Sequence, residues 1–175
     1  MKATGIVRRI DDLGRVVIPK EIRRTMRIRE GDPLEIYTSA GGEVIFKKYS
    51  PMGELASFAA EYAEALSMGT KLGVLICDRD HCIAAANVSK KEVLEKAVTE
   101  ALETIMENRR TVQPDSRVMA LEGVSNAICV ASPIIAAGDV TGAVVLVETV
   151  EASSADDTAV SLASVAARFL GNQTE

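Results

Sequence analysis

Seven cations lie close together near the start of the chain, and their spacing suits contact with a polyanion. They are Arg8, Arg9, Arg15, Lys20, Arg23, Arg24 and Arg27. On a helical wheel of about 100° per residue, the four from Lys20 onward share an arc of about 100° that contains no acid. Ile22 and Met26 lie on the opposite side of this wheel. Duplex DNA carries one negative charge per roughly 1.7 Å of its axis, and an arginine fork bridges phosphate oxygens or the edge of guanine. The pattern therefore predicts a surface that binds double-stranded DNA.

The charge of the chain is divided unevenly along its length. Residues 1–50 carry eleven Lys and Arg against seven Asp and Glu, whereas the remaining 125 carry nine against eighteen. The net charge of −5 thus conceals a basic first part. A charge run is most often a solvated helix face, which is the alternative interpretation. The absence of acids within the arc favours a nucleic-acid partner instead.

Turn-forming residues at Tyr49–Gly53 predict a boundary between an N-terminal domain, residues 1–52, and a C-terminal domain, residues 53–175. In the N-terminal domain we expect two short strands around a tight turn, then a helix, then a hairpin around Gly41 and Gly42. In order, these elements are Gly5–Ile10, Asp11–Gly14, Arg15–Ile18, Pro19–Met26, Leu34–Thr38 and Glu43–Lys48. A domain of about fifty residues built this way buries little apolar surface, so we expect it to dimerise.

The C-terminal domain alternates between helical and strand patterns. The expected elements are a helix over Glu54–Met68, strands over Leu72–Asp78 and Cys82–Asn87, a helix over Ser89–Asn108, strands over Val118–Glu122, Ala127–Ile135 and Gly142–Thr149, and a helix from the Ser154–Asp157 cap to Leu170. This order predicts helices packed on a mostly antiparallel sheet, and the fold class of the whole chain is therefore α+β.

The first 26 residues also carry a resemblance, most specifically in the segment GRVVIPKEIRRT. Up to about Tyr49 the chain resembles the AbrB-type transition-state regulators. The resemblance implies an intertwined, swapped-hairpin dimer with a β-barrel-like core. It also implies that Arg8, Arg15, Arg23 and Arg24 contact DNA. Arg9 stands where that family commonly has a lysine, which keeps the charge.

The C-terminal domain resembles that of the stage V sporulation protein T family, which is a GAF-like α/β domain. The resemblance rests on the order of elements and on the segments SPMGELASFAAEYAEAL and LICDRD. It implies a regulator of transcription, activating or repressing, during spore formation. Two alternatives stay open: an antitoxin-like DNA-binding protein that regulates its own operon, and a GAF small-molecule sensor whose DNA binding is secondary.

The C-terminal domain is expected to regulate or to oligomerise. Apolar strands around Leu75, Ile83, Val130 and Val145 could line the site of a small-molecule effector, although a filled core has the same pattern. The last helix has a small-residue face that could pack on another subunit and give a tetramer, or could pack within the chain. That face consists of Ala159, Leu162, Ala163, Ala166, Phe169 and Leu170.

Enzymatic and metal chemistry find little support in the sequence. Cys77, Cys82, Cys129 and His81 are too few for a Cys/His zinc site of the usual spacing, so we expect no metal and no cofactor. A thiol-based GAF-type reductase is a weaker alternative, because buried thiols are usually inert. Turn chemistry accounts for Asp78 and Asp80. Low aromatic content and abundant arginine predict phosphate contacts and DNA-shape readout, hence a sequence-tolerant regulator that is not an enzyme.

The first residues lack the apolar core of a signal peptide, and no stretch has the length and hydropathy of a membrane span. We therefore expect a cytoplasmic, nucleoid-associated protein without a membrane partner.

Overall fold

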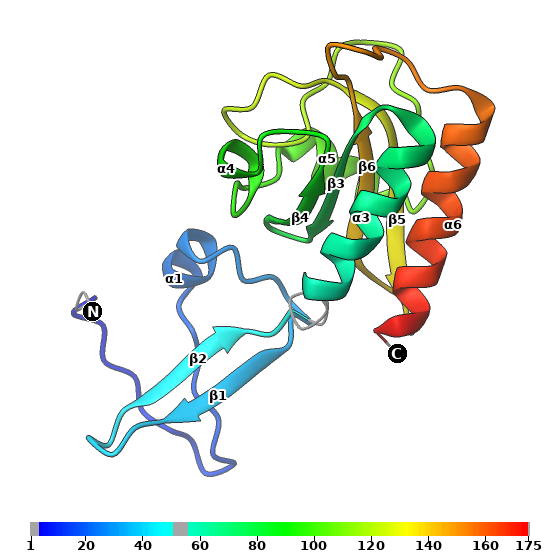
Figure 1. The fold of residues 1–175 in the computed structure, drawn as a ribbon. Helices are drawn as coiled ribbons and strands as arrows, with labels where there is room; N and C mark the ends of the chain where they lie inside the picture. The colour runs from blue at the N-terminus through cyan, green and yellow to red at the C-terminus, as the bar shows by residue number, and fades with distance from the viewer. Residues whose placement is uncertain (1–3, 51–55, 175) are drawn as a thin grey trace. The chain divides into compact units, whose positions relative to one another are not determined.

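A computed structural model describes residues 4–50 and 56–174, and the chain divides into two compact units (Figure 1). The N-terminal unit is Met1–Tyr49 and the C-terminal unit is Ser50–Glu175. The boundary expected between residues 52 and 53 falls among residues 51–55, which lie outside the described residues.

The N-terminal unit contains one short helix and one hairpin. Helix α1 (Lys20–Thr25) follows Pro19, whose φ of −57° already suits the first turn. Strands β1 (Leu34–Thr38) and β2 (Val44–Lys48) pair antiparallel, with Ile36 opposite Phe46. The predicted helix and hairpin are both present, with ends that differ by one residue.

The two strands expected before α1 are not formed within this chain. The tight turn over Asp11–Gly14 is present: the Asp11 amide donates to the Arg15 carbonyl at 3.1 Å, and the Gly14 amide donates to the Asp11 carbonyl at 3.0 Å. Gly14 has a φ of +75°, which a residue without a side chain adopts at no steric cost. A strand needs a neighbour along its whole backbone, and no described segment of this chain pairs with residues 5–10 or 15–18.

The N-terminal unit also lacks an interior. Within residues 4–49, Pro19 is the only buried residue. Exposed apolar side chains occur instead in every part of the unit: Ile6, Val7, Ile10, Leu13, Val16, Val17, Met26, Ile36, Tyr37, Val44, Phe46 and Tyr49. Their own chain covers these side chains only in part, and Val7 is 84% exposed.

The C-terminal unit is built around one antiparallel sheet in the order β4-β3-β6-β5. Its strands are β3 (Gly73–Asp78), β4 (Cys82–Ala86), β5 (Ile128–Ala136) and β6 (Asp139–Val147). Its helices are α3 (Ala56–Thr70), α4 (Lys90–Val93), α5 (Glu100–Glu107) and α6 (Asp157–Gln173). Helices α3 and α6 pack on one face, and α4 and α5 pack on the other (Figure 1). The mixed content confirms the α+β class.

Both faces of the sheet are covered by dense apolar cores. Along β3, Val74 and Ile76 belong to the cluster beneath α3 and α6, whereas Leu75 and Cys77 belong to the cluster beneath α5. The alternation follows the two-residue period of a strand. Because both faces are buried, the strands are apolar almost throughout, which is why their positions could be predicted.

Two expectations for the C-terminal unit are wrong. The helix predicted over Ser89–Asn108 is interrupted between α4 and α5, where Glu95 has a φ of 61° and Val98 pairs with Leu121. Thr99 then caps α5 by accepting from the Leu102 amide at 3.2 Å. The strand predicted over Val118–Glu122 is reduced to isolated bridges.

Helices α3 and α6 and the four strands begin and end within about three residues of their predicted bounds. Helix α6 begins two residues later than the predicted cap would place it, because Asp156 rather than Ser154 accepts from the first turn, at 2.7 Å from the Ala159 amide.

Candidate nucleic-acid interface

Three of the predicted cations lie on α1 and point into solvent. Lys20, Arg23 and Arg24 are exposed and form no ion pair with any residue that the structure describes, whereas Ile22 is half-buried. Within Lys20–Thr25 the wheel therefore holds, with the cations facing solvent and Ile22 on the less exposed side, whereas Met26 follows the helix and is 59% exposed. Unpaired, solvated guanidinium and ammonium groups hold only mobile counterions, which a polyanion can displace.

Arg27 does not belong to this face. Helix α1 ends at Thr25, and Arg27 follows with a φ of 50°, in the left-handed region. The Ile28 amide turns back to the Arg23 carbonyl at 2.7 Å, which closes the helix. Arg27 is half-buried and its Nη1 atom is inaccessible to solvent. Placing Arg27 on the same helical arc is therefore wrong, because the helix ends before it.

Arg15 is a predicted DNA contact that lies at the tight turn and forms an ion pair with a described residue of the same turn. Its Nε atom donates to Oδ2 of Asp11 at 2.8 Å. The hydrogen bond from the backbone amide of Arg15, and after it the one from the Arg15 guanidinium, hold the pKa of the Asp11 carboxyl below its usual range. Sequence reasoning had recognised Asp11 only as a turn residue. The Asp-x-x-Gly-Arg spacing was the available signal.

Arg8 and Arg9 lie on the segment before the turn, and both are exposed. The Nη1 atom of Arg8 donates to the Val7 carbonyl at 3.1 Å. Because residues 4–10 pair with no described strand, the structure of one chain does not bring these two arginines together with α1.

An ion pair with a nearly inaccessible carboxylate fixes the segment that follows α1. The carboxylate of Asp32, whose side chain is 4% exposed, lies 3.4 Å from Nζ of Lys48 and accepts from the Arg29 amide at 2.8 Å. Lys48 also donates to the Arg27 carbonyl at 3.0 Å. Lys48 is therefore a structural cation that joins β2 to the end of α1. Sequence reasoning missed this contact, because nothing local relates residues 32 and 48.

The described part of the C-terminal unit offers little reactive chemistry. Cys77 and Cys82 are fully buried opposite each other on β3 and β4. A hydrogen bond with Cys82 and desolvation raise the pKa of the Cys77 thiol well above its ordinary value. Burial and the charge of Glu148 raise the pKa of the half-buried Cys129 thiol. Thiols in this state are poor nucleophiles, which supports the packing interpretation.

Among residues 4–50 and 56–174, no three His, Cys, Asp or Glu side chains are grouped so as to hold a metal ion. Nor is any helix in this part of the chain long and apolar enough to cross a bilayer.

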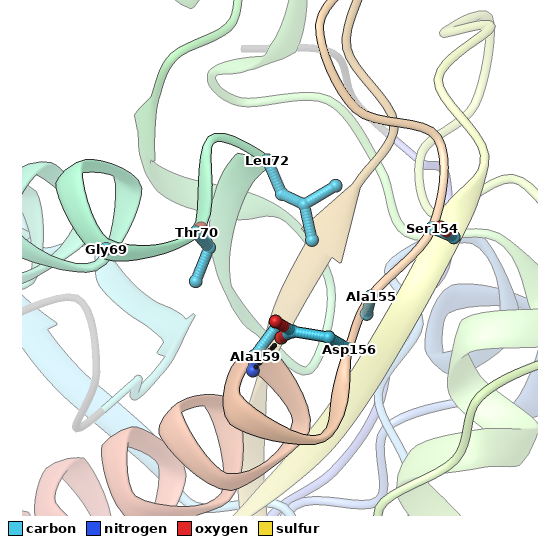
Figure 2. Close-up of a pocket in the computed structure, with 7 residues that line it drawn as sticks. All are labelled: Gly69, Thr70, Leu72, Ser154, Ala155, Asp156 and Ala159. Carbon is cyan, nitrogen blue, oxygen red and sulfur yellow. Dashed lines mark hydrogen bonds between the residues drawn. The ribbon is translucent and has the colours of Figure 1, made fainter.

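One pocket of about 220 Å³ opens where the end of α3 meets the start of α6. It is lined by Gly69, Thr70, Leu72, Ser154, Ala155, Asp156 and Ala159. Figure 2 shows the Asp156 carboxylate turned back onto the Ala159 amide at its floor. The strand residues expected to line an effector site lie elsewhere: Leu75 and Val145 are buried on one face of the sheet, and Val130 on the other. They form a filled core.

Comparison with known proteins defines first the class of each unit. The chain is 61% identical over 51 residues to the transition state regulatory protein AbrB of Bacillus subtilis (strain 168), which covers 29% of this chain and 52% of that protein. The family described as antidote-toxin recognition MazE, bacterial antitoxin, matches residues 7–53. A GAF domain/HD domain protein from Geobacter sulfurreducens has a similar structure, with a TM-score of 0.51 at 14% identity over 73% of this chain and 98% of that one. The C-terminal unit thus has a GAF fold.

The family follows from the match to the longer unit. The family described as stage V sporulation protein T C-terminal, transcription factor, matches residues 54–175. Stage V sporulation protein T of Bacillus subtilis (strain 168) is 58% identical over 151 residues, which cover 83% of this chain and 84% of that protein. The chain belongs to the stage V sporulation protein T family of transcription factors.

Proposed function

We propose that the chain regulates sporulation genes by binding duplex DNA as a homodimer, with little sequence preference, through the exposed cations of its N-terminal unit. The contact residues are Arg8, Arg9, Arg15, Lys20, Arg23 and Arg24, with Arg27 at the margin. The observation that carries the proposal is the face of α1, where Lys20, Arg23 and Arg24 are exposed and form no ion pair with a described residue. This face lies in the segment that is similar to AbrB.

Dimerisation supplies what one N-terminal unit lacks. The apolar side chains around Val7, Val17 and Ile36 are exposed in the single chain, and the segments on either side of the Asp11–Gly14 turn pair with no strand that the structure describes. A second copy can cover the first set and pair with the second, as an intertwined hairpin dimer does. The cationic face then occurs twice, which suits two-fold contact with a duplex.

The proposed readout depends more on the DNA backbone than on its bases. Arginines on a short exposed helix reach phosphates first, and phosphate contacts carry no sequence information. Discrimination between sites then comes from the width and flexibility of the duplex, which tolerates many sequences. An A·T-rich duplex with a narrow minor groove is therefore the first probe.

The test is fluorescence-anisotropy titration of the full chain with A·T-rich duplex over a salt series. We expect a steep negative slope of log affinity against log salt. Arg23→Ala and Arg24→Ala should each weaken binding about three- to tenfold and lower the slope by about two, because a dimer carries each substitution twice. Arg110→Ala removes an exposed charge from the C-terminal unit and is the matched control. Unchanged affinity in both α1 variants would contradict the proposed face.

A tetramer is proposed through the C-terminal unit. The small residues Ala159, Ala163 and Ala166 of α6 pack inside their own unit, so they do not form the interface. The outer face of α6 instead exposes Val165 by 61% and Phe169 by 39%. Val165→Glu should convert tetramers to dimers in sedimentation velocity, whereas Val150→Glu on a loop should not. Only dimers in the unmodified protein would refute this interface.

The lengths of the two family matches favour a sporulation regulator over an antitoxin. The antitoxin family matches the N-terminal part alone, whereas the sporulation family matches the longer unit. A regulator of chromosomal genes works in the cytoplasm at the nucleoid and needs no catalytic activity.

An effector is proposed for the pocket beside Ser154. Thermal-shift screening of small polar metabolites on the full chain, repeated with Ser154→Leu to fill the pocket, tests it.

A further inference from the structure

We propose that Asp11 is a positioning residue that holds the Arg15 guanidinium ready for DNA. This inference rests on the proposed function, in which Arg15 contacts the duplex. Both residues belong to one tight turn, so their arrangement depends on five consecutive residues and not on the rest of the unit.

The Asp11 carboxylate organises the turn through both of its oxygens. Oδ1 accepts from the Leu13 amide at 3.0 Å and from the Arg15 amide at 2.8 Å. Oδ2 accepts from Nε of Arg15 at 2.8 Å. One side chain therefore fixes both the backbone of Arg15 and the base of its guanidinium.

The geometry leaves the binding edge of Arg15 available. A guanidinium has five N–H donors in a planar fork, and Asp11 engages the one on Nε. The terminal Nη donors remain for the oxygens of a phosphate or a guanine edge. The Arg15 side chain is 70% exposed, so a duplex can reach it. A long side chain that is already held loses less conformational freedom on binding.

A second effect opposes the first. Asp11 carries a negative charge close to the expected position of a phosphate, and charge alone would make it weaken DNA binding. The side chain of Asp11 is 38% exposed, so solvent and salt screen this repulsion. The two effects have opposite signs, and replacing Asp11 therefore distinguishes positioning from repulsion.

The test is a double-mutant cycle on the full chain, measured by anisotropy at several salt concentrations. Asp11→Asn keeps an oxygen for the two backbone amides but removes the charge that holds Nε. We expect it to weaken DNA binding about fivefold when Arg15 is present and less than twofold in the Arg15→Ala background. Equal losses in both backgrounds would mean that Asp11 only shapes the turn, and tighter binding would mean that it only repels; either result overturns the proposal.

Arg15→Lys provides a second variant that keeps the charge at an exposed position. An ammonium held by Asp11 presents no planar fork, so we expect most of the loss that Arg15→Ala causes. Wild-type affinity in Arg15→Lys would overturn the positioning role while leaving Arg15 as a cationic contact. Wild-type affinity in Arg15→Ala would show that Arg15 does not touch DNA, which overturns that part of the proposed function and the inference with it. Sedimentation of each variant checks that the dimer is retained.

Discussion

The two units of this chain differ most in what they bury. The C-terminal unit covers both faces of a four-stranded sheet and buries large side chains such as Leu75, Ile76 and Leu146 completely. The N-terminal unit buries only Pro19 among residues 4–49. The hydrophobic effect scales with apolar area removed from water, so we expect the C-terminal unit to be stable alone and the N-terminal unit to need a partner. The stability of the N-terminal unit should therefore depend on association, and that of the C-terminal unit on its own core.

The largest expected effect comes from opening the core of the C-terminal unit. Leu146 is fully buried in β6 between Val74 and Val130. Leu146→Ala should lower the free energy of unfolding of this unit by about 2–5 kcal/mol, because it removes buried methyl groups and leaves a cavity. Urea denaturation followed by circular dichroism measures it. When both proteins also carry Val165→Glu, which removes the proposed tetramer contact, the midpoint should not change with protein concentration, and a concentration-dependent midpoint would then break the comparison between the units.

Two exposed valines sharpen the comparison. Val17 is 70% exposed in the N-terminal unit, and Val150 is fully exposed on a loop of the C-terminal unit. Val17→Asp should weaken dimerisation by about 2 kcal/mol or more, because association would bury an unpaired polar group there. The identical change at Val150 should have no effect. Sedimentation equilibrium measures both, and equal behaviour of the two variants would mean that a second chain does not cover Val17.

A smaller effect separates the structural cation from the binding cations. Lys48→Met should destabilise the segment after α1 by about 1–2 kcal/mol, because it removes a charged partner of the buried Asp32 carboxylate. Hydrogen exchange over residues 20–32 measures the loss. The slope of DNA affinity against salt should stay unchanged, unlike the slope in Arg24→Ala. A lower slope in Lys48→Met would place Lys48 on the DNA and contradict its structural role.

The same contrast in burial explains how much of the fold the sequence could predict. Apolar runs buried on two faces located β3, β4, β5 and β6 to within about three residues of their ends. Helical periodicity located α3 and α6 in the same way. The helix over Ser89–Asn108 was wrong because Leu94, Ala97 and Val98 continue the helical period, while the pairing of Val98 with Leu121 overrides it.

The sequence predicted the candidate site only for residues that are close to one another along the chain. The helical wheel located Lys20, Arg23 and Arg24 correctly on one exposed face. It also placed Arg27 on that face, which is wrong because the helix ends at Thr25. Whether α1 stops at Thr25 depends on the segment that Lys48 holds from β2, which no helical period encodes. The strands predicted over Gly5–Ile10 and Arg15–Ile18 are not formed, because residue types indicate an extended segment but do not supply the paired neighbour that a strand needs, and no described segment of this chain pairs with them.

The smallest expected effect is kinetic and tests whether the two units unfold independently. Iodoacetamide reacts with thiolates. The pKa of the buried, free Cys77 thiol is raised by its hydrogen bond with Cys82 and by desolvation. The stability contributed by such a neutral thiol is present below its unfolded pKa and is lost as pH rises toward the folded value.

At neutral pH, Cys77 should therefore be labelled only when the C-terminal unit opens. In the Val165→Glu variant, which lacks the proposed tetramer contact, dilution that dissociates the dimer should leave this labelling rate unchanged, because the core that protects Cys77 lies within one chain. The half-buried Cys129 provides the internal control, since it should react slowly but measurably without unfolding. Faster labelling of Cys77 on dilution, with Cys129 unchanged, would mean that the stability of the C-terminal core depends on association of the N-terminal units.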